Sequence, residues 1–156
     1  EVIRCWASVA MGIARDIGEA RRIPGIPKVA FLSPAQDMTT LAGECVAATD
    51  CDITVRMISV GQPHRAIPVT GALCIAATAR VDGSLVSGMF DTTRCGSELR
   101  LAHPSGVTSV DAQLEKRNGN WYATSATIYR TARRLMDGYV YMPAARTPGL
   151  GVVPEL

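Results

Sequence analysis

Apolar side chains recur at helical spacing over residues 1–15. The positions are Val2, Ile3, Trp6, Val9, Ala10 and Ile13. This spacing places them along one face of a helix. The stretch RRIPGIPK (21–28) then favours an extended connector, because proline restricts the residue before it and glycine loosens a helix. We therefore expect an N-terminal amphipathic helix, a connector, and an apolar strand over 28–33.

Further along, short apolar or alternating runs are typical of β-strands. They cover 52–60, 98–103, 107–116, 121–130 and 139–143. RNGN (117–120) predicts a hairpin, since Asn-Gly suits a type I′ turn. Residues 34–51 are compatible with a loop, a short strand or a helix. Residues 131–138 read as a short helical or bridging segment, and the tail (144–156) is rich in proline and glycine and is expected to be irregular.

One further helix is predicted over 70–80. Good helix formers follow Pro68, Thr70 is a candidate N-cap, and Asp82-Gly83 ends the segment in a turn. Together the elements predict an α+β domain in which a mainly antiparallel sheet packs on at least two helices.

The composition narrows the class of protein. The chain has 156 residues, 47% hydrophobic and 19% charged, which suits one globular domain. A net charge of +2 without a basic run argues against nucleic-acid binding. No apolar run approaches the roughly 20 residues of a membrane helix. The five cysteines form no CxxC pair, so we expect no metal site and reduced thiols in a cytoplasmic protein.

The first residues bear on completeness. The chain starts without methionine and without a signal peptide, and EVIRCWASVAMGIA resembles the middle of a helix. These features lead us to expect a fragment, a processed chain or a separate half of a longer protein.

The predicted helix start is the first candidate site. Thr70, Gly71 and Ala72 would occupy its first turn, where unpaired N–H groups carry positive partial charge. A glycine there lets an anionic ligand approach the backbone. The alternative is an ordinary capped core helix. His64 is a weaker candidate that lies shortly before this helix.

The second candidate is the loop between two predicted strands. Ser105 can donate a hydroxyl, Gly106 leaves a backbone N–H open, and Pro104 fixes the geometry beside them. His103 can gain or lose a proton near neutral pH. Together they would make a polar cradle for a carboxylate. The alternative is a tight turn whose histidine is bonded to backbone.

Other residues are weaker candidates. Arg130, Arg133 and Arg134 would share a face if their segment were helical, and guanidinium groups match carboxylates; the alternative is a solvated face with local ion pairs. Cys95 is interpreted as buried filler, and Lys28 as a surface lysine at a strand end.

Three stretches resemble the later half of the PrpF-type family in order and spacing. They are ISVGQPHRAIPVTGALCIAATA, RLAHPSGVTSVDAQLE and YRTARRLMDGYVYMP, and MGIARDIG…IPKVAFLSP fits the approach to that half. The family includes 2-methylaconitate cis-trans isomerases, aconitate and methylitaconate delta-isomerases, and 4-oxalomesaconate tautomerases. The resemblance covers nearly the whole chain except its tail.

The resemblance implies a diaminopimelate-epimerase-like fold. In that fold two similar α+β domains each wrap a sheet around a central helix, and the active site lies in the cleft between them. Residues 1–143 would form the second, C-terminal domain, and 144–156 an irregular tail. The implied partner is an N-terminal domain or companion chain; the apolar face left exposed without it would favour a homo-oligomer.

The resemblance also implies a function. It is a cofactor-independent isomerase, acting by proton transfer on an unsaturated di- or tricarboxylic acid such as aconitate or methylaconitate. Related epimerases carry a catalytic cysteine before the equivalent helix, where this chain has Ile67-Pro68-Val69. The catalytic base is therefore expected in the first domain, while His103, Ser105, Gly106 and the helix start at 70–72 would hold the substrate. The rival interpretations are a non-catalytic carboxylate-binding module and a structural half that needs a companion chain.

Overall fold

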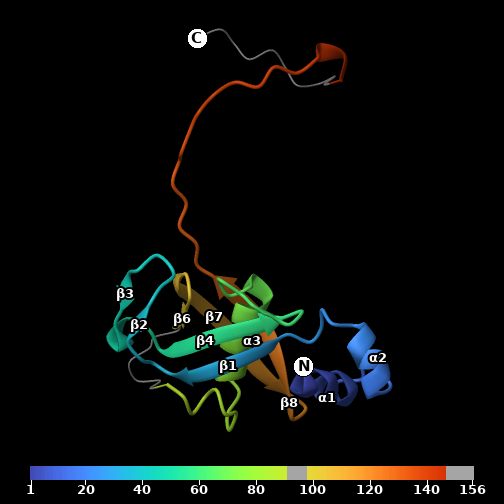
Figure 1. Ribbon diagram of the computed structural model, residues 1–156. Helices are drawn as coiled ribbons and strands as arrows, with labels where there is room; N and C mark the ends of the chain where they lie inside the picture. Colours follow the sequence, from blue (N-terminus) through green and yellow to red (C-terminus); the bar gives the residue numbers. More distant parts are fainter. Residues whose placement is uncertain (91–97, 147–156) are drawn as a thin grey trace.

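The computed structural model describes residues 1–90 and 98–146. At its centre a six-stranded sheet packs on one helix, α3 (Val69–Ala79), as Figure 1 shows. The strands follow the order β1-β4-β6-β7-β8, and β5 pairs with β4. Their bounds are β1 Val29–Pro34, β4 Ile53–Ser59, β5 Gln62–Pro63, β6 Leu99–His103, β7 Gly106–Arg117 and β8 Asn120–Ile128.

The strand predictions are confirmed for this sheet. Its pairs are antiparallel except for β4 with β6, which is parallel. The predicted hairpin joins β7 to β8, with positive φ at both Asn118 (50°) and Gly119 (81°), as a type I′ turn requires. Residues 34–51 contain a two-stranded ladder of β2 (Met38–Thr39) and β3 (Cys45–Val46), followed by a 3-10 helix at Ala48–Asp50.

The core lies between α3 and the sheet. Ala72, Ala76 and Ala79 are at most 5% exposed, and their small side chains let the helix approach the strands closely. Alternate residues of the central strands, among them Ile53 and Leu101, point toward the helix and are fully buried. The central helix is therefore held by packing over most of its length.

The N-terminal segment forms two helices instead of the one predicted over 1–15. Helix α1 (Val2–Ala10) ends where Gly12 adopts a φ of 70°, a left-handed conformation that glycine enters without strain. Helix α2 (Ile17–Arg22) begins at Asp16, whose carboxylate accepts a hydrogen bond from the N–H of Glu19. The spacing of Asp16 and Glu19 is a capping-box signal that the sequence carries.

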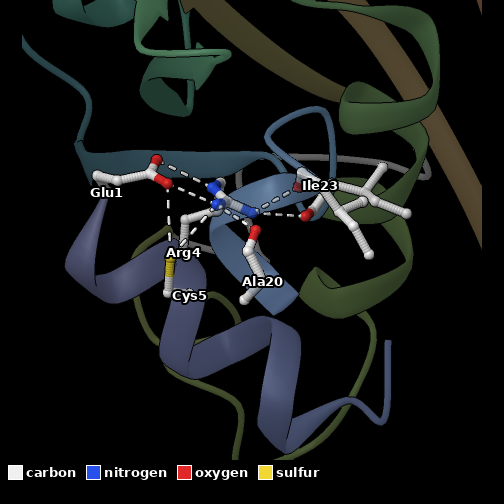
Figure 2. Close-up of polar contacts among 6 residues, drawn as sticks. Glu1, Arg4, Cys5, Ala20 and Ile23 are labelled. Carbon is white, nitrogen blue, oxygen red and sulfur yellow. Dashed lines mark hydrogen bonds and ion pairs between the residues drawn. The ribbon is translucent and has the colours of Figure 1, made fainter. Parts of the chain in front are cut away.

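Helix α1 buries a polar face and exposes an apolar one. Arg4 (3% exposed), Cys5 and Ser8 face inward, whereas Val2, Ile3 and Trp6 are more than 60% exposed. Figure 2 shows the Arg4 guanidinium between α1 and α2. It donates to the carbonyl oxygens of Ala20 (2.8 Å), Ile23 (2.8 Å) and Ile26 (2.9 Å) and to the carboxylate of Glu1. The apolar pattern predicted the helix correctly but does not mark its buried face.

The segment after β8 differs from its prediction. Residues 131–143, which we call the C-terminal arm, contain neither the predicted helical segment nor the predicted strand over 139–143. In Figure 1 the arm runs away from the sheet, and a 3-10 helix follows at Ala144–Arg146. Leu135, Tyr139 and Tyr141 are more than 80% exposed. A strand needs a neighbour for its N–H and C=O groups, and no described segment pairs with the arm.

Candidate carboxylate-binding site

The HPSG stretch is the turn of the β6–β7 hairpin. His103 pairs with Gly106 in the register, which leaves Pro104 and Ser105 as the two turn residues. Gly106 has a φ of 128°, a conformation that side-chain-bearing residues rarely adopt. These four residues therefore reverse the chain between β6 and β7, and they place an imidazole and a hydroxyl next to each other.

The His103 side chain is built into this turn. It is 6% exposed, and its Nδ1 accepts a hydrogen bond from the N–H of Ser105 at 3.2 Å. The proton must then lie on Nε2, which donates to Thr108 Oγ1 at 2.8 Å. Burial lowers the pKa of His103, and the positive charges of Arg56 and Arg130 lower it further. The imidazole is therefore neutral near pH 7 and occupied at both nitrogens.

This arrangement predicts a pH-dependent stability. A lowered pKa means that the folded state binds the His103 proton less tightly than the unfolded chain does. The stabilisation is complete above pH 6.5, the ordinary value, and is lost as the pH falls below it. We expect the free energy of unfolding in urea to fall less between pH 7.5 and 5 in His103→Gln than in the parent chain. Identical pH profiles would contradict the assignment.

The turn is also hydrogen-bonded to two neighbouring loops. The hydroxyl of Ser105 donates to the carbonyl oxygen of Arg65 at 2.6 Å, and the N–H of Leu41 donates to the carbonyl oxygen of Pro104 at 2.7 Å. Arg65 lies just before α3. The Ser105 hydroxyl thus links the hairpin to the segment that leads into the central helix.

The start of α3 has no side-chain cap. Pro68 is the N-cap residue, and Ala72 is the first residue of the helix whose N–H reaches a carbonyl, that of Pro68, at 2.9 Å. The prediction of Thr70 as N-cap was therefore wrong, because the fixed φ of proline makes Pro68 the last extended residue. Thr70 is exposed and Gly71 half-buried, so the first-turn amides lie near the surface.

Gly71 lies close to a side chain of the sheet. A Cβ at this position would lie 2.5 Å from the terminal methyl of Met57 on β4, so a larger residue would require this flexible methyl group to move. Ala72 is fully buried against the sheet, and its N–H already donates to Pro68, so this predicted site residue belongs to the core instead. His64 precedes the helix, donates its N–H to the carbonyl of Met57 at 2.8 Å, and holds a buried Nε2 without a hydrogen-bond partner in the described residues.

A polar hollow of ≈ 310 Å³ lies beside the hairpin. It is lined by Val107, Thr108, Ser109, Tyr129, Arg130 and Thr131. Arg130 therefore lines the same hollow as Thr108, the residue whose hydroxyl is bonded to His103. Arg133 lies in the exposed arm instead, and Arg134 pairs with Asp137 at 3.2 Å, so the shared helical face expected for these arginines does not form. Cys95 lies outside the described residues.

Two of the predicted groups meet at one end of the sheet. The 103–106 turn and the segment before α3 are joined through Ser105 and Arg65, and Arg130 lies beside Thr108. The Arg130 guanidinium beside Thr108 suits an anionic ligand, and so, separately, do the free amides of Thr70 and Gly71 at the start of α3. Sequence reasoning missed Thr108. A two-residue turn places it diagonally across from His103 on the same face of the hairpin, so the signal was present.

Other classes of site find no support in residues 1–90 and 98–146. No group of three or more His, Cys, Asp or Glu side chains in these ranges is arranged to hold a metal ion. No helix in the same ranges is both long and apolar enough to cross a bilayer.

Comparison with known proteins gives consistent matches. A family model described as PrpF protein matches residues 1–143. The chain is 37% identical over 146 residues to a 2-methyl-aconitate isomerase of Shewanella oneidensis, covering 92% of this chain and 36% of that protein. It is 30% identical to a 3-methylitaconate isomerase of Eubacterium barkeri over 94% of this chain and 38% of the relative. A 4-oxalomesaconate tautomerase of Pseudomonas putida is 37% identical over 83% of this chain and 32% of that protein.

A solved structure agrees with the fold. The crystal structure of a methylitaconate-delta-isomerase superposes with a TM-score of 0.72 at 29% identity, over 98% of this chain and 39% of that one. The predicted fold class, an α+β diaminopimelate-epimerase-like domain with its sheet around a central helix, is confirmed. The chain spans about a third of the length of these relatives.

Proposed function

Because this chain belongs to the PrpF family, we propose that it is part of an isomerase acting on an unsaturated di- or tricarboxylic acid. The names of the relatives support this class, since they describe isomerases of methylaconitate and methylitaconate and a tautomerase of oxalomesaconate. The observation that carries the proposal is the match over residues 1–143 together with the uncapped start of α3.

The chemistry that we propose is a proton transfer. Removal of a proton next to the double bond gives an anion that is delocalised over the neighbouring carbons and carboxylate. Return of the proton to another carbon shifts the double bond, and return to the same carbon after rotation changes cis to trans. Fixed donors must hold the added charge, and a base must lie within hydrogen-bond reach of the proton.

Within this reaction, we assign the described chain the task of holding carboxylates. The amides of Thr70 and Gly71 and the guanidinium of Arg130 are available to an anion. His103, Ser105 and Gly106 make the turn that fixes the approach to this helix. His103 is a poor candidate for the base, because it is buried and its acceptor nitrogen Nδ1 is already bonded to the N–H of Ser105. We place the base on a companion domain.

Two exposed apolar surfaces support a companion domain. One is the outer face of α1, with Val2, Ile3 and Trp6, and the other is the C-terminal arm. Unpaired apolar surface of this extent is typical of an interface. We therefore propose residues 1–143 as the second domain of a two-domain isomerase and 144–156 as its tail, with a homo-oligomer as the rival way to cover the same surfaces.

Proton NMR of this chain with trans-aconitate in D₂O tests whether the chain binds the acid without removing its carbon-bound protons. We expect the ligand lines to broaden in the presence of protein, because the acid binds. Exchange of its carbon-bound protons should stay at the protein-free rate, because the base is elsewhere. Faster exchange would place a working base in these 156 residues, and unbroadened lines would contradict the holding site.

The rival function, a non-catalytic carboxylate-binding module, makes the same binding prediction. The coding sequence upstream separates the two. A preceding domain with a lysine and a helix-start cysteine supports the isomerase, and a start codon directly before residue 1 supports the module.

A further inference from the structure

A second hollow lies between α1, the segment before β1, and α3. It has a volume of ≈ 450 Å³, within the range of small-molecule sites. Met11 just after α1, Ile26, Met57 of β4 and Ile75 of α3 contribute apolar walls. Thr70 and Gly71 also line it, so the hollow adjoins the helix start that we propose as a carboxylate holder.

The walls of this hollow are suited to hydrocarbon. Met11 is 65% exposed and Ile26 is 48% exposed, so apolar atoms face solvent where a ligand could cover them. Met57 is almost fully buried, with its terminal methyl packed beside Gly71 at the floor. Methionine side chains adapt their shape to what they contact, and two of them border the hollow.

One cation lies at the hollow, and no acidic residue lines it. Lys28 is exposed and has no hydrogen-bond or ion-pair partner in the described part of the chain. An ammonium group beside an apolar cavity is complementary to a carboxylate that carries an alkyl chain. The Cys74 thiol also lines the hollow, is exposed, and therefore offers a local reporter.

We propose that this hollow receives the alkyl substituent of the acid that the enzyme isomerises, a chain of several carbons, with a carboxylate beside Lys28. The inference rests on the proposed function and adds the substrate class. The hollow is far larger than a single methyl group requires, and it is continuous with the α3 start through Thr70 and Gly71. Alkyl-substituted acids should therefore bind more tightly than unsubstituted ones.

Alkylation of Cys74 by iodoacetamide, followed by peptide mass spectrometry, measures occupancy of the hollow. The probes are succinate, butylsuccinate and octylsuccinate, which are saturated and do not react with thiols. We expect octylsuccinate to protect Cys74 at concentrations of the order of tenfold lower than butylsuccinate, since each buried methylene adds several-fold in affinity. Succinate should protect least. Cys45 is exposed on β3, outside the hollow, and its alkylation rate should not change.

Matched variants separate the contribution of the Lys28 ammonium from that of the apolar walls. Lys28→Gln should weaken protection by octylsuccinate about two- to fivefold, whereas Lys116→Gln, at the only other lysine, should leave it unchanged. Ala7→Leu narrows the hollow from α1 and should lower protection by octylsuccinate more than by succinate. Ala10→Leu, on the same helix at an exposed position that does not line the hollow, should not.

Four results would overturn the inference. The first is equal protection by succinate and octylsuccinate. The second is equal protection by octyltrimethylammonium, which would mean adsorption without a carboxylate preference. The third is protection that trans-aconitate does not compete away, which would separate the hollow from the substrate site. Broadening of trans-aconitate lines without protection of Cys74 by octylsuccinate would overturn this inference and leave the proposed function standing; absent broadening would contradict the proposed function itself.

Discussion

A Thr70→Glu variant is expected to be more stable than the parent chain and yet to bind trans-aconitate at least tenfold more weakly. Thr70 lies in the exposed first turn of α3, which has no acidic residue and no side-chain cap. A carboxylate there interacts favourably with the helix dipole and should add about 0.3–1 kcal/mol to the free energy of unfolding.

The loss of binding has an electrostatic cause. If the ligand carboxylate is held at the same amides, the new side chain competes for them and repels the ligand. Two like charges about 5 Å apart near a protein surface repel by roughly 3 kcal/mol before salt screening, so a tenfold loss is a conservative expectation.

Calorimetric unfolding and NMR titration measure the two effects on the same sample. Thr70→Gln keeps the side-chain size without the charge and should bind nearly normally. Ser125→Glu adds the same charge on the exposed strand β8 and should leave affinity unchanged. Opposite signs for stability and binding at Thr70 would be difficult to explain by misfolding. Unchanged affinity would remove the α3 start from the site.

Replacement of Arg4 by methionine is expected to separate α1 from α2 and the connector after it without unfolding the sheet. The guanidinium holds three backbone carbonyls, those of Ala20, Ile23 and Ile26, and the Glu1 carboxylate. Each hydrogen bond to a charged donor contributes roughly a factor of ten or more to the equilibrium. Opening of the helix pair should therefore become at least a hundredfold more frequent.

The effect should be local because the cores are separate. Cys5, Ala14 and Ala20 form a small cluster between the helices, distinct from the cluster under α3. Amide hydrogen exchange should speed up in α1 and α2 and remain slow in α3 and β6. Alkylation of Cys5, which is 2% exposed, should rise in parallel.

Arg22→Met is the matched control, since Arg22 is exposed in the last turn of α2. It should change neither exchange nor Cys5 alkylation. Uniformly faster exchange across the sheet in Arg4→Met would contradict the separation of the two cores.

The contact between Arg4 and Glu1 should also survive moderate acid, because the hydrogen bonds from Arg4 lower the pKa of Glu1 to about 2. Its contribution is present above pH 4.5 and is lost as the pH falls towards 2.

The molecule is predictable from its sequence where short-range rules decide the outcome. Alternation over 52–60 predicted β4, and Asn118-Gly119 predicted the β7–β8 turn, because strand faces and positive φ depend on residues a few positions apart. The motif around His103 and the helix near Thr70 identified the end of the sheet that carries the candidate site.

The tertiary structure decided what depends on contacts between distant segments. It decided that Arg4 turns inward and Trp6 outward on α1, because Arg4 satisfies carbonyls 16 to 22 residues away. It also decided that Ser105 donates to Arg65, 40 positions earlier, and so makes the hairpin a support for α3. The apolar pattern of the arm predicted a strand, but a strand forms only against a partner edge, and the described chain provides none for it. Local pattern therefore determined the helices and strands of the central sheet and its helix, and burial and hydrogen bonding between distant residues determined which of their faces became core, support or candidate site.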